Sequence, residues 1–252
     1  YYDPVKHSLG SQTANAFALA LGLYPEGDAQ AIADDLARDV NDTHNGHHTT
    51  GITGSKYLYG ALAEYVHGDT AMRLLHNTDY PSFGHLFSLG ATTFWECWGE
   101  PEIDAKWGAR SLNHPMQGAF DKWFYDGLAG IRPDPARTGF RRVIFSPQII
   151  EGLSSAKADF GSLYGNNHAE WKVEDGVLTY QISLPANTEG RVRLPVGDPS
   201  LLQEGGKPVL ESPGVQLLSQ DERISEFAVP CGQYVFTTKW PPAPRVITKS
   251  TP

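Results

Sequence analysis

The sequence is poor in cysteine, in positive charge and in long apolar stretches, and each shortage excludes a class of protein. Its two cysteines, Cys97 and Cys231, lie far apart and lack the spacing of metal ligands, so we expect two unpaired thiols. Lysine and arginine total 20 against 29 acidic residues, and the net charge of −9 argues against a nucleic-acid partner. No apolar run approaches the roughly 20 residues that cross a bilayer. We therefore expect a soluble protein that binds a neutral ligand and needs no metal or other cofactor.

The beginning of the chain lacks an initiator methionine, and it also lacks the basic start and apolar stretch of a signal peptide. A helical pattern follows almost at once, as it would in a chain cut from a longer one. We therefore expect that an N-terminal portion is missing. A cytoplasmic and a secreted location are both compatible with these features.

Helical periodicity dominates the first part of the chain. Apolar residues recur at positions i, i+3, i+4 and i+7, as on one-sided helices, in two segments: Ala14, Phe17, Ala18 and Leu21, then Leu58, Ala61, Leu62 and Tyr65. A further helix is expected over residues 113–130, ending at Gly130. Its apolar face would carry four residues: Phe120, Trp123, Phe124 and Leu128.

The pattern changes near residue 140 from helical periodicity to the alternation of strands. Residues 178–184 alternate between apolar and polar side chains, which predicts a strand with one buried face. Asp175 and Gly176, just before it, form a favoured two-residue hairpin turn.

This change predicts two domains and an α+β fold class. Residues 1–140 should be helix and loop, and residues 141–240 an antiparallel β-sandwich of two packed sheets. Residues 241–252 should be a flexible tail.

The segment from Tyr80 to His114 carries the residues best suited to chemistry. Within it Glu96 is flanked by Trp95 and Trp98, and aromatic rings partly desolvate a carboxyl group, which suits it to proton transfer. Glycoside hydrolysis needs two carboxyl groups astride the scissile bond, one as an acid and the other as a base or nucleophile. Glu96 can be one of them. The alternative is that Glu96 points to solvent beside two packed tryptophans.

Three other patterns suggest chemistry less strongly. His44, His47 and His48 follow H-x-x-H-H spacing, which is not a strong metal signature, and the loop reads more simply as a connection between helices. Residues 154–157 spell S-x-x-K, but before a strand and not at the start of a helix. Residues 80–84 resemble a nucleophile elbow without its first glycine.

Several motifs occur together in an order that resembles a known family. The stretch ATTFWECW is similar to the A-T-T-hydrophobic-W-E-x-W signature of the bacterial α-L-rhamnosidases of glycoside hydrolase family 78. GHHTTGITGSKYL resembles the family's G-H-x-x-T-G stretch, and DYPSFGHL its Y-P-S-hydrophobic-G turn. SLNHPMQGAFDKWFYDGLAGIRPDP resembles its S-hydrophobic-N-H helix with the A-G-I-x-P-D-P exit. The similarity runs from Ser11 to about Tyr234.

The resemblance implies a fold, an activity and roles for particular residues. Residues 1–140 would be the last helices of an (α/α)6 toroid, and the β-sandwich would follow. Glu96 would be the general base of an inverting α-L-rhamnosidase, and His114 an active-site histidine. Four residues would contact the substrate, a rhamnose-containing glycoside or polysaccharide: Trp95, Trp98, His47 and Tyr80.

The family's catalytic acid lies well upstream of this signature, and nothing before residue 80 matches it. About half of the toroid's helices are expected in residues 1–140, so the chain reads as a fragment, or as a truncation with altered activity. Two alternatives to a glycosidase stay open. One is a non-catalytic carbohydrate-binding remnant. The other is a low-specificity esterase in which Ser82 or another hydroxyl meets His85 or His114. A partial toroid would also leave an apolar face uncovered, which favours self-association.

Overall fold

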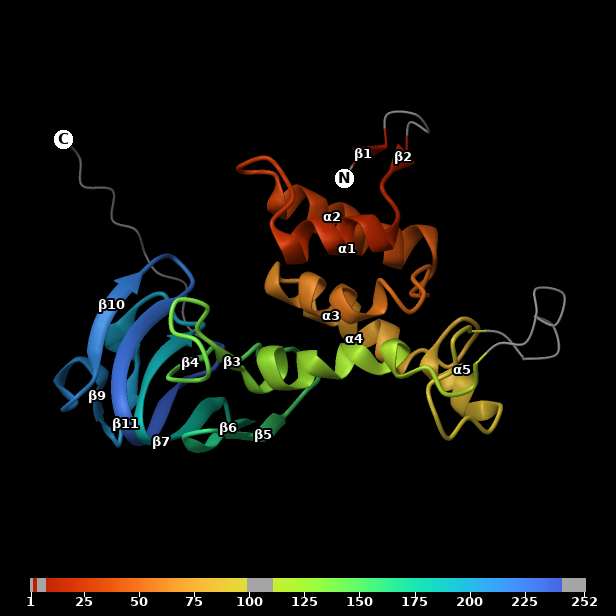
Figure 1. Ribbon diagram of the computed structural model, residues 1–252. Helices are drawn as coiled ribbons and strands as arrows, with labels where there is room; N and C mark the ends of the chain where they lie inside the picture. The colour runs from red at the N-terminus through yellow and green to blue at the C-terminus, as the bar shows by residue number, and fades with distance from the viewer. Residues whose placement is uncertain (1, 4–7, 99–110, 242–252) are drawn as a thin grey trace, which may run out of the picture. The chain divides into compact units, whose positions relative to one another are not determined.

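The computed structural model describes residues 2–3, 8–98 and 111–241 (Figure 1). Contacts divide the chain into two compact units, Tyr1–Trp123 and Phe124–Pro252. The first is helical and the second is built mainly of strands. None of the helices in the described part of the chain is both long and apolar enough to cross a membrane.

The helical unit begins with a short antiparallel pair, β1 (Tyr2–Asp3) and β2 (Ser8–Leu9). Helix then follows helix, as predicted, with no strand between residues 11 and 75. The helical elements are α1 (Gln12–Leu21), α2 (Ala29–Arg38), the wide turn η1 (Asp39–Thr43), α3 (Ser55–Glu64), α4 (Gly68–His76), α5 (Phe83–Ser88) and the 3-10 helix η3 (Pro115–Asp121).

Helix α1 buries a different face from the one its apolar spacing predicts. Ser11 caps its N-terminus by accepting a hydrogen bond from the N–H of Ala14. Leu21, expected in the core, is 52% exposed, whereas Gln12 and Asn15 are fully buried. The polar residues face inward because Gln12 forms hydrogen bonds with the backbone of a neighbouring loop. The buried face of α1 therefore contacts this loop as well as α3.

The helix expected over residues 113–130 exists, but not as a regular α-helix. It consists of the 3-10 helix η3 and the π-helix η4 (Phe124–Ala129), separated by a short turn. Because each kind of turn advances the chain by a different angle per residue, the predicted apolar face does not hold throughout. Trp123 and Leu128 are buried as expected, but Phe124 is 40% exposed.

In its described part, the second unit contains nine strands after η4. They are β3 (Ile131–Pro133), β4 (Arg142–Phe145), β5 (Ser155–Ser162), β6 (Gly165–Glu174), β7 (Val177–Leu194), β8 (Gln203–Glu204), β9 (Lys207–Pro208), β10 (Gln216–Gln220) and β11 (Ser225–Lys239). Two 3-10 turns, η5 (Pro199–Leu201) and η6 (Val209–Glu211), lie between strands. Strands therefore begin at β3, before the expected start at residue 141.

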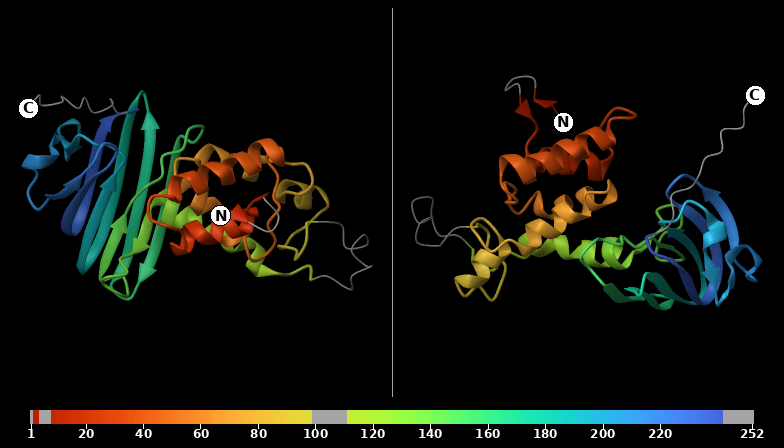
Figure 2. Two further views of the ribbon diagram at one scale, coloured as in Figure 1. Left: turned by 90° about the horizontal axis from the view of Figure 1, so that it is seen from above. Right: turned by 180° about the vertical axis from the view of Figure 1, so that it is seen from behind.

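Hydrogen bonds join these strands into one sheet of nine strands, where we expected two packed antiparallel sheets. All the pairs are antiparallel except β4 with β7, which run parallel. The sheet is continuous because β7 has 18 residues and β11 has 15, so each reaches from one part of it to the other. A bulge between Pro230 and Gly232 lets β11 bend, and Figure 2 shows the resulting curvature.

The hairpin between β6 and β7 is the predicted one. Asp175 and Gly176 both have positive φ angles, 50° and 71°, as a type I′ turn requires. The apolar positions of residues 178–184 point to the core, which also contains Trp171 and Phe227. Residues 242–252 of the expected tail lie outside the described residues.

Candidate functional site

Two segments that bracket residues 99–110 pair through their backbones and bring two predicted site residues together. The N–H of Glu96 donates to the carbonyl of Ser111 at 2.9 Å, and the N–H of His114 donates to the carbonyl of Phe94 at 2.7 Å. The hydroxyl of Thr93 also donates to this second segment. Glu96 and His114 therefore lie on adjacent paired segments, although 18 residues separate them in the sequence.

The carboxylate of Glu96 is anchored within this pairing. Its Oε2 accepts a hydrogen bond of 3.0 Å from the N–H of Ser111, and the residue is half-buried. A fixed, partly shielded carboxylate differs from the alternative of a side chain that simply extends into solvent. Trp95 and His114 are half-buried as well, and His114 does not use its side chain to cap η3.

Trp98 is half-buried and packs against two aromatic rings. Its ring stacks on His48 with centroids 4.6 Å apart and meets Phe83 edge-on at 4.9 Å. Its indole Nε1–H donates to the carbonyl of Thr50 at 2.7 Å. The tryptophan next to the Glu96 segment is thus held by the loop that precedes α3.

An aromatic cluster lies behind the paired segments. Phe83 stacks on Phe120 at 4.6 Å, and Phe94 meets both of these rings edge-on. Gly118 allows Phe94 to approach, because a Cβ at this position would lie 2.4 Å from the ring. The cluster gives the backbone of the site a rigid support.

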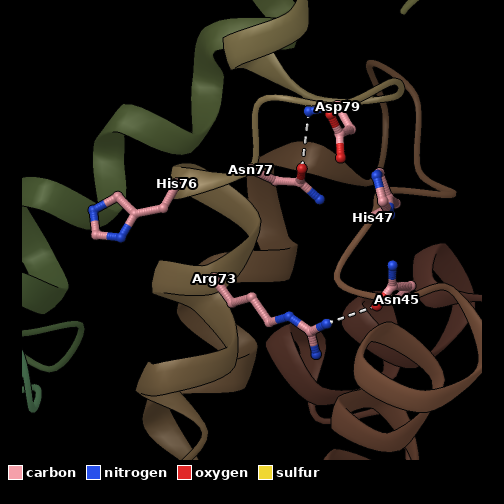
Figure 3. Close-up of a pocket in the computed structure, with 6 residues that line it drawn as sticks. All are labelled: Asn45, His47, Arg73, His76, Asn77 and Asp79. Carbon is pink, nitrogen blue, oxygen red and sulfur yellow. Dashed lines mark hydrogen bonds between the residues drawn. The ribbon is translucent and has the colours of Figure 1, made fainter.

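His47 lines a polar pocket of about 400 Å³ that none of the other five predicted site residues lines. Its lining residues are Asn45, His47, Arg73, His76, Asn77 and Asp79. In Figure 3 Arg73 reaches from α4 toward Asn45, whereas His76 points away from the other labelled residues. Arg73 donates a hydrogen bond of 3.0 Å to the side chain of Asn45, so part of the pocket lining has a structural role.

Tyr80 adjoins the pocket in sequence but lies at the surface. It is 59% exposed and meets the ring of His85 edge-on at 5.5 Å. That Trp95, Glu96, Trp98 and His114 share one concave surface stays a prediction. Three further carboxyl groups of the Tyr80–His114 segment that could serve as an acid, Glu100, Glu102 and Asp104, lie outside the described residues.

Ser82 cannot act as the surface nucleophile that an esterase needs. It is fully buried, and its Oγ caps α5 by accepting a hydrogen bond of 3.0 Å from the backbone N–H of His85. The likeness of residues 80–84 to a nucleophile elbow therefore reflects a helix N-cap.

The ring nitrogens of the three neighbouring histidines contact different partners. A ring nitrogen of His44 lies 3.1 Å from the carbonyl of Asp39, and one of His47 lies 2.9 Å from the carbonyl of His44. Nε2 of His48 lies 2.6 Å from the hydroxyl of Tyr59. Among the described residues no group of three histidine, cysteine or acidic side chains could hold a metal ion.

Sequence reasoning missed His48, which was read as part of a simple connection. Burial lowers the pKa of His48 to about 4, opposed by a hydrogen-bonding interaction with the backbone of Pro81, so its ring is neutral at pH 7. Thr50, whose carbonyl receives the bond from Trp98, falls within the G-H-x-x-T-G resemblance. The only signal for the contact was therefore that motif, because the two partners are 48 positions apart.

Two family models match successive parts of the chain. The bacterial alpha-L-rhamnosidase 6 hairpin glycosidase domain matches residues 5–128, and the bacterial alpha-L-rhamnosidase C-terminal domain matches residues 130–208. The chain belongs to the bacterial α-L-rhamnosidases. It carries helices of the six-hairpin domain followed by the C-terminal β domain, which confirms the family and the fold class inferred from the motifs.

Curated relatives agree with this assignment. An α-L-rhamnosidase of Formosa agariphila is 32% identical over 189 residues, which are 73% of this chain and 19% of the relative. One of Streptomyces avermitilis is 33% identical over 196 residues, which are 77% of this chain and 19% of the relative. The chain thus spans about a fifth of the length of these relatives.

Solved rhamnosidase structures have the same fold. The structure from Dictyoglumus thermophilum matches 91% of this chain and 25% of its own, with a TM-score of 0.78 and 32% identity. The Streptomyces avermitilis enzyme, solved in complex with L-rhamnose, matches 90% of this chain and 21% of its own, with a TM-score of 0.75 and 30% identity.

Proposed function

We propose that this chain supplies the general-base side of an inverting α-L-rhamnosidase, with Glu96 as the base. The observation that carries the proposal is the pairing of the two segments, which anchors the half-buried Glu96 carboxylate beside the backbone of His114. A general base must be held in a fixed orientation toward the water whose proton it accepts. The bond from Ser111 provides such a constraint.

The substrate class comes from the relatives. Those named above are α-L-rhamnosidases, and one was solved with L-rhamnose bound. We infer that His114 bonds a sugar hydroxyl or orients Glu96, and that Trp95 and Trp98 shield the apolar side of the methyl pentose. His47 and Tyr80 would contact the outer part of a rhamnose-containing glycoside.

Inversion also requires a general acid, at roughly 6.5–9.5 Å from the base so that a water can enter between them. The chain spans only 19% of the length of the first relative. We therefore place the acid in a part of a rhamnosidase that lies outside these 252 residues. The acid would protonate the leaving oxygen while Glu96 takes the proton of the attacking water.

The test compares Glu96→Gln with the unchanged sequence in the polypeptide encoded by the complete reading frame. Glutamine keeps the shape and the acceptor oxygen but cannot take a proton, so release of L-rhamnose from a nitrophenyl rhamnoside should fall by about 10²–10⁴. Glu26→Gln removes the charge of an exposed glutamate in the same unit and should change nothing. Rhamnose affinity and the unfolding midpoint should be the same in all three proteins.

Two results would count against the proposal. Near-normal turnover by Glu96→Gln would show that Glu96 is not the general base. Binding of rhamnose without any turnover by the complete polypeptide would instead favour a carbohydrate-binding remnant. The 252-residue chain alone should release little rhamnose, because it would lack the acid.

A further inference from the structure

The loop from Gly46 to Thr50 is fixed by two elements of the helical unit. The amide of the fully buried Gln12 donates to the carbonyl of His47 at 3.1 Å and accepts from the N–H of Thr49 at 2.9 Å. It therefore holds the backbone on both sides of His48. At the other end of the loop, Asn77, the residue that follows α4, donates to the carbonyl of Gly46 at 2.9 Å.

The side chain of His48 is fixed as firmly as its backbone. It is 2% exposed, and its Nε2 lies 2.6 Å from the Tyr59 hydroxyl, which belongs to α3. Because the ring is neutral, Nε2 can accept a hydrogen bond from the hydroxyl of Tyr59, whose own pKa is raised well above the usual value by burial. Phe83 packs against the edge of the same ring at 5.6 Å.

Trp98 receives two contacts from this loop. Its ring lies nearly parallel to that of His48, with an interplanar angle of 23°, and its Nε1–H donates to the carbonyl of Thr50. Two residues before Trp98, Glu96 begins the backbone pairing with Ser111. Because the indole of Trp98 is held on one face and at its N–H, this end of the segment that carries Glu96 has little freedom to move.

We propose that His48 is a positioning residue for Trp98 and, through Trp98, for the segment that carries Glu96. The second half of this statement rests on the proposed function of Glu96. The first half concerns only the packing of the loop and is tested without any reference to catalysis. His48 touches neither water nor substrate in this role; it acts by fixing the indole.

The first experiment measures deuterium exchange of indole N–H groups by NMR in the ¹⁵N-labelled 252-residue chain. The Trp98 signal is identified by its absence in Trp98→Leu. In His48→Leu the stacked ring and the acceptor for Tyr59 are both lost, so we expect exchange of the Trp98 indole to accelerate by about tenfold or more. The Trp171 indole, which donates to the carbonyl of Leu128 in the other unit, is the internal control and should not change.

His48→Gln keeps an acceptor for the Tyr59 hydroxyl and loses the aromatic face, so it should accelerate exchange by only about threefold. This milder variant also covers the case in which His48→Leu fails to fold. His44→Gln, a change at a partly exposed histidine of the same segment, should leave the Trp98 signal unchanged. Unaltered Trp98 exchange in both His48 variants would overturn the proposal.

The second experiment is a double-mutant cycle on rhamnoside hydrolysis in the complete polypeptide. If His48 acts through Trp98, the combination of His48→Leu and Trp98→Leu should lower kcat no further than Trp98→Leu alone, and KM should move by less than about threefold. Multiplicative losses would show that His48 acts by another route. Absence of hydrolysis in the unchanged polypeptide would contradict the proposed function, while the exchange experiment would still decide the role of His48.

Discussion

The backbone N–H of Ser111 donates directly to the carboxylate of Glu96, 15 residues earlier in the chain. The bond runs across the pairing in which Ser111 also accepts from the N–H of Glu96, so the two residues are linked twice. One link fixes the backbone and the other fixes the group that we propose as the base.

Ser111→Pro should therefore reduce catalysis while Glu96 itself is unchanged. Proline has no N–H, and losing a hydrogen bond to a charged group costs roughly 1.5–3 kcal/mol, which corresponds to about a ten- to hundredfold loss in kcat. Steady-state hydrolysis of a nitrophenyl rhamnoside gives the measurement. Ser111→Ala keeps the N–H and removes only the hydroxyl, which accepts from Asn113, so it should stay within a few-fold of the unchanged enzyme. Equal losses in both variants would mean that this bond does not matter.

Buried His48 should make the helical unit sensitive to acid. Burial lowers its pKa in the folded chain to about 4 from 6.5, so the unfolded chain binds a proton more readily, and stability is lost as the pH falls from above 6.5 toward 4. The largest loss in the free energy of unfolding is roughly 3 kcal/mol, because each pKa unit corresponds to about 1.36 kcal/mol. Urea unfolding at pH 7 and pH 4.5 would measure it.

The comparison with His48→Gln isolates this effect from that of other groups. His47 and Tyr59 are the titratable groups that influence or contact the His48 ring, and both are retained in the variant. The variant should lose less stability than the unchanged chain between the two pH values. Parallel losses would assign the acid sensitivity to other side chains, such as Asp34, whose pKa is lowered by hydrogen bonds from Gln30 and His67.

Local features of the fold could be predicted from the sequence. The hairpin at Asp175 and Gly176 depends on two adjacent residues, and the helices α1 and α3 depend on apolar spacing within one or two turns. The single continuous sheet could not be predicted, because it depends on the length of β7 and β11 and on a bulge that lets β11 bend. The buried face of α1 was missed because Gln12 bonds a loop 35 or more residues away.

For the candidate site, short recognisable motifs identified Glu96 and His114, and their roles stay predictions. The stacking of Trp98 on His48 could not be predicted, because a tryptophan beside a carboxylate has the same sequence signature whatever it packs against. The role of Ser111 could not be predicted either, since its contribution comes from a backbone N–H that every residue except proline possesses.

Gly118 should tolerate no side chain. A Cβ there would lie 2.4 Å from the ring of Phe94, whose carbonyl receives the N–H of His114. Gly118→Ala should therefore destabilise the helical unit by about 1–3 kcal/mol through overpacking and should weaken rhamnoside hydrolysis as the pairing shifts. Gly51→Ala is the matched control, since a Cβ at that glycine meets nothing within 4 Å. A Gly118→Ala protein as stable as the control would show that Phe94 can move aside freely.

The end of η4 is held by aromatic donors from the sheet, and this predicts a specific loss of stability. The last carbonyls of a helix have no partner within it. Here the indole of Trp171 donates to Leu128 at 2.7 Å, and the hydroxyl of Tyr180 donates to Ala129 at 3.2 Å. Burial raises the pKa of Tyr180 well above its usual value, so the hydroxyl keeps its proton throughout the ordinary pH range.

Tyr180→Phe keeps the ring in the core and removes only this donor. The carbonyl of Ala129, a fully buried residue, then loses a partner, and unfolding of the β unit should become easier by about 1–2 kcal/mol. The urea midpoint should fall while the dependence of the unfolding free energy on urea stays the same, because the exposed area hardly changes. Tyr164→Phe, which removes a hydroxyl from a partly exposed tyrosine at the β5–β6 turn, should leave the midpoint where it is. If both variants unfolded at the same urea concentration as the unchanged chain, the bond from Tyr180 would contribute nothing to holding η4 on the sheet.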